Sequence, residues 1–152
     1  MTLLDSATSN GGWGCIVRDD EGDIVSARRG RGESLMSAFH GELIAAIQGA
    51  QAAADEGVGH VIIETDAAEV VQAVYSQAFD LSPMTFLVDE LRGVLEMNFI
   101  SWSVQQRPRS CNRVAHELAI LGSICEPDAE AVVAPIPDFI ACFIAKDSAP
   151  SD

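Results

Sequence analysis

Residues 60–74, HVIIETDAAEVVQAV, contain the change of pattern on which the expected fold depends. Residues 61–63 are β-branched and apolar, which is typical of a buried strand in a parallel or mixed sheet. From Ala67 to Val74 the apolar residues recur at helical spacing, so the strand must pass into a helix within one or two residues. The pattern therefore predicts a strand-to-helix junction at Asp66.

The residues around Asp66 leave two roles open for its carboxylate. A carboxylate at the carboxyl end of a strand in an open α/β sheet stands where such folds usually build their sites. Asp66 followed by Glu69 is also a good helix N-cap with a capping-box partner. The two roles can coexist, so both remain hypotheses at this point.

Before this junction, the pattern predicts three strands and a long helix. Residues 2–5 are expected to form a short strand, and the alternating runs WGCIVRD and DIVSARR, joined by an acidic turn that ends in Gly22, predict a β-hairpin. The glycines on either side of Trp13 predict that another backbone approaches this hairpin closely. Apolar residues at helical spacing predict a helix over about residues 34–56, which Gly57 ends.

After the junction, two more helices and one strand are expected. Ser-Pro at 82–83 predicts a helix start, with serine as N-cap and proline at the first helical position. Residues 99–104 alternate, with the apolar even-numbered residues on one side, and predict the last strand. A final helix is expected over about residues 112–122. Strands followed by alternating helices and strands imply a mixed α/β sheet covered on both faces.

Three acids stand on three different elements of this expected fold: Asp5 at the end of the first strand, Glu42 in the first helix and Asp66. Glu42 lies at the margin of its helix's apolar stripe, where an acid is either solvated or held for a purpose. Three carboxylates converging on one point would repel one another unless a divalent cation lay between them. Hard oxygen ligands suit Mg²⁺ or Mn²⁺, and paired ions of this kind serve phosphodiester cleavage.

Composition restricts the class of protein. A chain of 152 residues, 48% of them hydrophobic, is expected to form a domain with its own core. The four cysteines lack metal-ligand spacing, so a reducing, intracellular setting is predicted. The first residues do not resemble a signal peptide, and the apolar runs are too short to span a bilayer, so we expect neither secretion nor membrane insertion.

The charge distribution leaves nucleic-acid binding open. A net charge of −14 argues against broad electrostatic attachment to nucleic acid. The basic residues nevertheless gather in two groups, one over residues 28–31 and one made of Arg107, Arg109 and Arg113. Each group either holds phosphates or consists of solvated loop arginines.

The end of the chain differs from the rest in composition. Residues 125–152 mix acids and prolines with an apolar patch, and we expect a C-terminal tail after a domain over residues 1–124. The patch is expected to dock on this domain or on a protein partner through Phe139, Ile140, Phe143 and Ile144.

Taken together in order, these motifs resemble a ribonuclease H domain, and they are most similar to the retroelement-derived, reverse-transcriptase-like ribonuclease H domains found in plants. The resemblance is carried by Asp5, the hairpin GGWGCIVRDDEGDIV, the helix segment GELIAA, the strand end VIIETD and the final-helix segment NRVAHELA, over residues 1 to about 122. It implies a ribonuclease H-like fold with a five-stranded mixed sheet, helices on both faces, and the first and fourth strands adjacent.

The resemblance also implies a function. Asp5, Glu42, Asp66 and His116 would be the catalytic residues and would bind two Mg²⁺ or Mn²⁺ ions that cleave the RNA strand of an RNA/DNA hybrid. Asn112 and the three arginines of the second basic group, Arg107, Arg109 and Arg113, would hold the nucleic acid.

The chain departs from the catalytic members of that family at two positions. His116 stands where they have a fourth carboxylate, although histidine is frequent there in the plant group, and Gln106 matches a histidine thought to help proton transfer. His116 is otherwise expected to be a surface residue opposite the buried face of its helix. Two hypotheses follow: a hybrid-cleaving ribonuclease with reduced activity, or a degenerate module of the same fold that binds nucleic acid or a protein partner.

Overall fold

The computed structural model of the chain describes residues 2–8, 11–32, 35–77, 82–124 and 130–132, with the backbone alone for residues 2–6 and 130–132. The four apolar tail residues predicted to dock lie outside these ranges. Within the described ranges, no helix is both long enough and apolar enough to cross a membrane.

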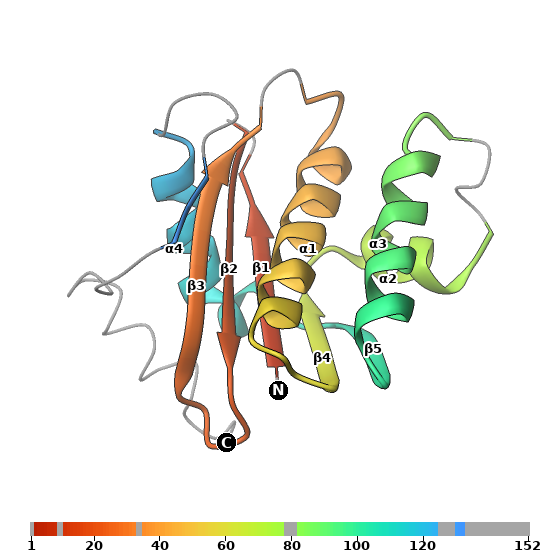
Figure 1. Cartoon of the computed structure of the whole chain (residues 1–152). Coiled ribbons are helices and arrows are strands. Elements are labelled where there is room, and N and C mark those ends of the chain that lie inside the picture. The colour runs from red at the N-terminus through yellow and green to blue at the C-terminus, as the bar shows by residue number, and fades with distance from the viewer. Residues whose placement is uncertain (1, 9–10, 33–34, 78–81, 125–129, 133–152) are drawn as a thin grey trace.

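A mixed sheet with the strand order β5-β4-β1-β2-β3-β6 forms the centre of the fold (Figure 1). The strands are β1 (Thr2–Ala7), β2 (Gly12–Arg18), β3 (Ile24–Arg31), β4 (His60–Thr65), β5 (Ser101–Gln106) and β6 (Glu130–Val132). The predicted hairpin is confirmed as β2 and β3, and β1 pairs in parallel with β4, so the first and fourth strands are adjacent.

The sheet has one more strand than the five that were predicted. β6 pairs antiparallel with β3 and adds a short strand to that edge. It comes from the segment assigned to the C-terminal tail, so at least residues 130–132 of that segment extend the sheet of the domain.

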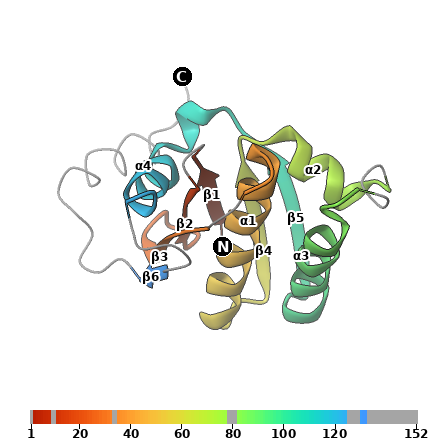
Figure 2. The ribbon, with the colours of Figure 1, turned by 90° about the horizontal axis from the view of Figure 1, so that it is seen from above.

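Helices cover both faces of the sheet, as predicted (Figure 2). They are α1 (Ala38–Asp55), α2 (Ala68–Tyr75), α3 (Thr85–Asn98) and α4 (Arg113–Gly122), with a single 3-10 turn, η1 (Arg109–Cys111), before α4. α1, α2 and α3 share one buried core with residues such as Leu43, Ile63 and Leu91. α4 closes a second, smaller core on the opposite face, in which Leu118 packs against Ile16.

Two helices begin later than predicted. α1 begins at Ala38, because the Ser37 side chain accepts a hydrogen bond from the His40 backbone N–H and caps the helix there. Ser82 and its proline form a turn before α3, in which the Ser82 carbonyl accepts from the Thr85 N–H. Regular helix therefore starts at Thr85.

The predicted last strand also begins later. Ile100 was expected on its buried side but is 83% exposed, and β5 starts one residue later at Ser101. The backbone N–H groups of Ile100 and Ser101 both donate to the Gly59 carbonyl, which holds this bend before the strand. Val104, further along, is buried as predicted.

The predicted close backbone approach at the glycines of β2 is confirmed. α4 lies directly against this strand, and a Cβ atom built on Gly14 would lie 2.5 Å from the Ala119 nitrogen and 2.7 Å from the Ala115 oxygen. Both neighbours belong to the helix backbone and cannot move aside independently. The absence of a side chain at Gly14 thus sets how closely α4, which carries His116, approaches the sheet.

Replacing Gly14 by alanine should therefore destabilise the fold by about 1–3 kcal/mol, the usual range for overpacking a core. Gly93→Ala is the matched control, because nothing lies within 4 Å of a Cβ at that position of α3. Alanine favours a helix over glycine, so the control should gain about 0.5–1 kcal/mol. Denaturant unfolding measures both changes, and a Gly14→Ala variant as stable as the wild type would show that α4 can shift away from β2.

Candidate active site

Two of the predicted site residues, Glu42 and Asp66, lie at the same hollow of about 210 Å³. Asp66 directly follows β4, and Glu42 projects from the first half of α1, which packs over β1. Arg109, at the start of η1, lines the same hollow. The fold thus brings together two acids from different elements, at the carboxyl end of β4 as the sequence predicted.

Glu42 is held in surroundings that oppose its charge. Burial, followed by the negative charge of Asp66, raises its pKa from 4.5 to about 7, although a backbone hydrogen bond from Ala7 and the charge of Arg109 lower it. The Oε2 atom of Glu42 and the Oδ1 atom of Asp66 are both buried, and neither has a hydrogen-bond partner among the described residues. Of the two roles left open for Glu42, this burial favours the one in which the acid is held for a purpose.

Asp5 can be placed only through its backbone. It lies in β1 opposite Cys15 of β2, one residue beyond the Leu4–Glu64 pair that joins β1 to β4. This register carries the Asp5 backbone to the end of β4 that precedes Asp66. The side chain of Asp5 lies outside the described atoms, so its place in the cluster stays a prediction.

His116 lies closer to Glu42 than the helical pattern suggested. It was expected to be exposed, but it is half-buried, and its Nδ1 atom is buried without a partner in the described part of the chain. It lines a second hollow of about 360 Å³ with Ala7, Thr8, Ala38, Glu42 and Arg109. The expectation of a surface residue is wrong because α4 packs tightly on β2 and brings His116 over the end of β1.

Arg109 binds the acid that was expected to bind a metal. Its Nε atom lies 2.8 Å from Oδ2 of Asp66, whose side chain is only 12% exposed. The helix-cap role proposed for Asp66 is wrong, because the N-cap of α2 is Ala67 and makes no side-chain cap bond. The Thr65 hydroxyl instead accepts a hydrogen bond from the Ala67 N–H at this turn. The sequence did not predict the Arg109–Asp66 pair, since nothing local links residues so far apart in the chain.

The other predicted nucleic-acid ligands are arranged unequally. Arg107 pairs with Glu64 at 3.3 Å and stays half exposed, and Arg113 is exposed at the start of α4. Asn112 is 1% exposed, so a direct contact between its side chain and a phosphate is wrong. Gln106 is the last residue of β5 and pairs with Thr65.

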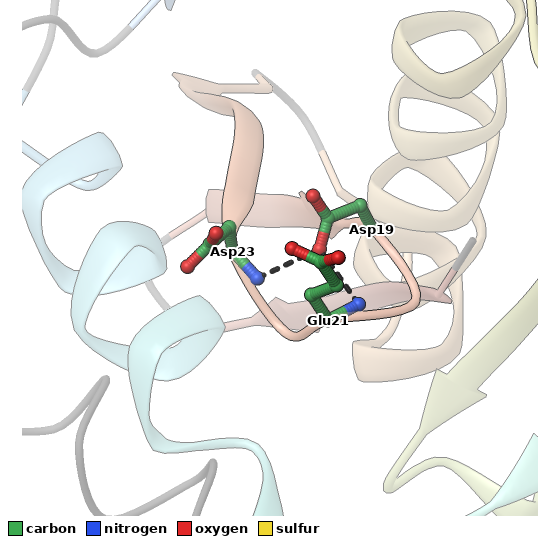
Figure 3. A group of neighbouring side chains, drawn as sticks. All are labelled: Asp19, Glu21 and Asp23. Atoms are coloured by element: carbon green, nitrogen blue, oxygen red, sulfur yellow. Dashed lines mark hydrogen bonds between the residues drawn. The ribbon is translucent and has the colours of Figure 1, made fainter.

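A second group of acids lies far from this site, in the turn between β2 and β3. Oxygen atoms of Asp19, Glu21 and Asp23 lie within 4.8 Å of one another (Figure 3). Asp19 Oδ1 accepts hydrogen bonds from the backbone N–H groups of the other two residues, so it holds the tight turn of the hairpin. The hydrogen bonds of the turn therefore explain why these three acids lie close together.

The donor set at Glu42 and Asp66 fits a hard divalent cation. Each acid keeps one buried oxygen without a described partner. Burial, and after it the negative charge of Asp66, raises the pKa of Glu42, and a bound cation would favour the charged form of this carboxyl group. The imidazole of His116 adds a softer nitrogen donor at the neighbouring hollow, which suits Mn²⁺ better than Mg²⁺. Among the described residues, Arg109 already pairs with Asp66, and its positive charge also acts on Glu42.

The raised pKa of Glu42 predicts a pH-dependent gain from Glu42→Gln. Between pH 4.5 and 7 the folded state holds a proton that the unfolded chain releases, so the wild type loses stability as the pH rises through this window. Glutamine removes that loss. The variant should be more stable than the wild type by about 1–3 kcal/mol at pH 8 and no more stable at pH 4.

Denaturant unfolding at the two pH values in a metal chelator measures this difference. Glu69→Gln is the control, because Glu69 lines the same hollow but is exposed, and its replacement should leave the pH profile unchanged. Equal stability of Glu42→Gln and wild type at pH 8 would contradict the electrostatic description of the site.

Comparison with known families agrees with this fold. The chain matches the family described as Reverse transcriptase-like over residues 3–122, and it belongs to that family. The described fold is that of ribonuclease H domains, so the resemblance seen in the sequence is confirmed at this level. The comparison with curated proteins found no match.

Solved ribonuclease H structures superpose over most of the chain. The N-terminal RNase H domain of a Mycobacterium tuberculosis protein has a TM-score of 0.70 at 16% identity and covers 80% of this chain and 93% of that one. RNase H1 from Halobacterium salinarum has a TM-score of 0.66 at 22% identity, covering 80% and 95%. LC11-RNase H1, solved in complex with an RNA/DNA hybrid, has a TM-score of 0.65 at 14% identity, covering 79% and 94%. At these identities the likeness establishes the fold.

Proposed function

We propose that this domain is a divalent-metal-dependent endonuclease that cleaves the RNA strand of RNA/DNA hybrids. The observation that carries the proposal is the pair of buried carboxylates, Glu42 and Asp66, at the carboxyl end of β4 in a ribonuclease H fold. The two negative charges repel each other, and a cation bound between them would remove this repulsion. Binding of a hybrid by LC11-RNase H1, a protein of the same fold, supports this choice of substrate.

In this proposal, one group of residues binds the cations and another binds the nucleic acid. Asp5, Glu42, Asp66 and His116 would hold the cations, which would supply an activated water and charge stabilisation for the leaving 3′ oxygen. The exposed guanidinium of Arg113, with Arg107 beside β5, holds phosphates of the hybrid at the edge of the site. Because His116 offers an imidazole nitrogen where a carboxylate would attract a second cation, we expect reduced activity in Mg²⁺ and better activity in Mn²⁺.

A cleavage assay tests this function. The full chain is incubated with an RNA/DNA hybrid labelled on the RNA strand, in Mn²⁺, in Mg²⁺ and in EDTA. We expect products that carry a 5′ phosphate in both metals, faster in Mn²⁺, and none in EDTA. The lack of cleavage in either metal by a chain that binds the hybrid would overturn the proposal.

A second candidate function is a non-catalytic module that binds nucleic acid or a protein partner. It is favoured by the net charge of −14, by His116 in place of an acid, and by Arg109 already neutralising Asp66. The same assay separates the candidates, since this module would bind hybrid without cleaving it. For either function we propose an intracellular setting and a retroelement origin shared with the plant group.

A further inference from the structure

Arg109 was expected to bind phosphate, but its guanidinium is hydrogen-bonded to Asp66. Its Nε donates to Asp66 Oδ2 at 2.8 Å, and Arg109 lines both hollows that meet at Glu42. The charge of Arg109 also lowers the pKa of Glu42. One guanidinium therefore pairs with Asp66 and also acts on Glu42 through its charge, although the pKa of Glu42 stays raised.

The two partners of this ion pair differ greatly in exposure. The Asp66 side chain is 12% exposed and follows β4 directly, whereas the Arg109 side chain is 64% exposed and sits on a single 3-10 turn. The acid is fixed and the guanidinium has room to leave. An ion pair with one solvated partner is weak, so a divalent cation can displace it at low cost.

Resting on the metal site of the proposed function, we propose that Arg109 competes with the divalent cation for Asp66 and is displaced when the cation binds. Arg109 then acts as a positioning residue that keeps the two acids in place and exchanges with the cation. Displacement frees the guanidinium beside Arg107 and Arg113, where the phosphates of a nucleic acid would arrive. Cation binding and the strength of the nucleic-acid contact are thereby coupled.

Titration with Mn²⁺ alone, followed by calorimetry or by electron paramagnetic resonance of free Mn²⁺, measures the competition directly. Arg109→Gln should bind Mn²⁺ at least about threefold more tightly than the wild type, because the competing charge is gone. Arg107→Gln is the matched control, since it loses the same charge from the pair with Glu64, and its affinity should equal that of the wild type. Arg109→Lys keeps the charge and should lie between Arg109→Gln and the wild type.

A second readout follows the wild type itself and does not rest on the cation affinity of any variant. The Nε–H resonance of Arg109, assigned through the loss of its signal in Arg109→Lys, should shift when Mg²⁺ is added, while that of Arg107 should not. Identical Mn²⁺ affinities for wild type and Arg109→Gln, or an Arg109 signal unmoved by Mg²⁺ that does bind, would overturn the exchange and leave the metal site standing. Failure of every protein to bind either ion would overturn the metal site together with the exchange.

Discussion

Replacing Asp66 by asparagine should lower the rate of hybrid cleavage by about a hundredfold or more, since a bound cation supplies several kcal/mol of transition-state stabilisation. Asparagine has nearly the same volume as aspartate but no charge to hold a cation. The Asp66 side chain is only 12% exposed, so solvent does not replace the negative charge that asparagine lacks. Single-turnover cleavage of a labelled hybrid in Mn²⁺ measures the loss.

Stability should not account for that loss of activity. Asp66→Asn breaks the exposed ion pair with Arg109, which is worth at most about 1 kcal/mol, and it also removes one cause of the raised pKa of Glu42. These effects oppose each other, so the melting temperature should change little.

Glu64→Gln is the matched control for this prediction. Glu64 lies two residues earlier in the chain, within β4, and carries a similar ion pair, with Arg107, but it projects from the face of β4 opposite the buried Ile63. Its loss should leave cleavage within about twofold of the wild type, as expected for a surface pair. Equal rates for wild type, Glu64→Gln and Asp66→Asn would remove Asp66 from the chemistry.

The fold was predictable because each element carries its own local signal. The β-branched run at 61–63 and the helical spacing after Ala67 located the β4-to-α2 junction within a residue or two. The glycines around Trp13 predicted the close approach of another backbone, which the fold shows to be that of α4. Gly57, with a φ of 75°, ends the first helix as expected. These signals act over one or two turns of chain, which is the range that periodicity can report.

The arrangement of the site was less predictable because it depends on contacts between distant segments. Asp66 satisfied every local criterion for a helix N-cap, yet its carboxylate turns to Arg109, which only the packing of η1 near β4 brings within reach. The late start of α3 reflects a similar limit, because Ser82 and Pro83 stabilise a turn as readily as a helix end.

The burial of His116 shows why a helical wheel misleads at this position. The wheel considers α4 alone and places His116 opposite Leu118 and its apolar neighbours. In the fold, α4 lies so close to β2 that its flank also meets β1. A side chain on that flank is then enclosed by Ala7, Thr8 and Glu42.

This enclosure sharpens the prediction for His116→Asp, which should raise Mg²⁺-dependent cleavage by about tenfold or more, the scale of 1.4 kcal/mol in the barrier. A carboxylate is a harder ligand than imidazole and adds the negative charge that a second Mg²⁺ needs. The ratio of the cleavage rate in Mn²⁺ to that in Mg²⁺ should fall accordingly. Measuring kcat/KM for one hybrid in each metal gives both quantities.

The substitution should also lower the stability of the protein, which the same substitution at an exposed position would not do. A new carboxylate at the hollow shared with Glu42 adds like-charge repulsion, so His116→Asp should melt at a lower temperature than the wild type in EDTA and recover in millimolar Mg²⁺. His116→Asn separates charge from size, because asparagine matches aspartate in shape and should produce neither the loss nor the gain. If His116→Asp changes neither Mg²⁺-dependent cleavage nor Mg²⁺-dependent stability, His116 has no part in cation binding. The binding-module hypothesis would then explain the missing carboxylate better than an enzyme of reduced activity, because a module that only binds has no use for a second cation.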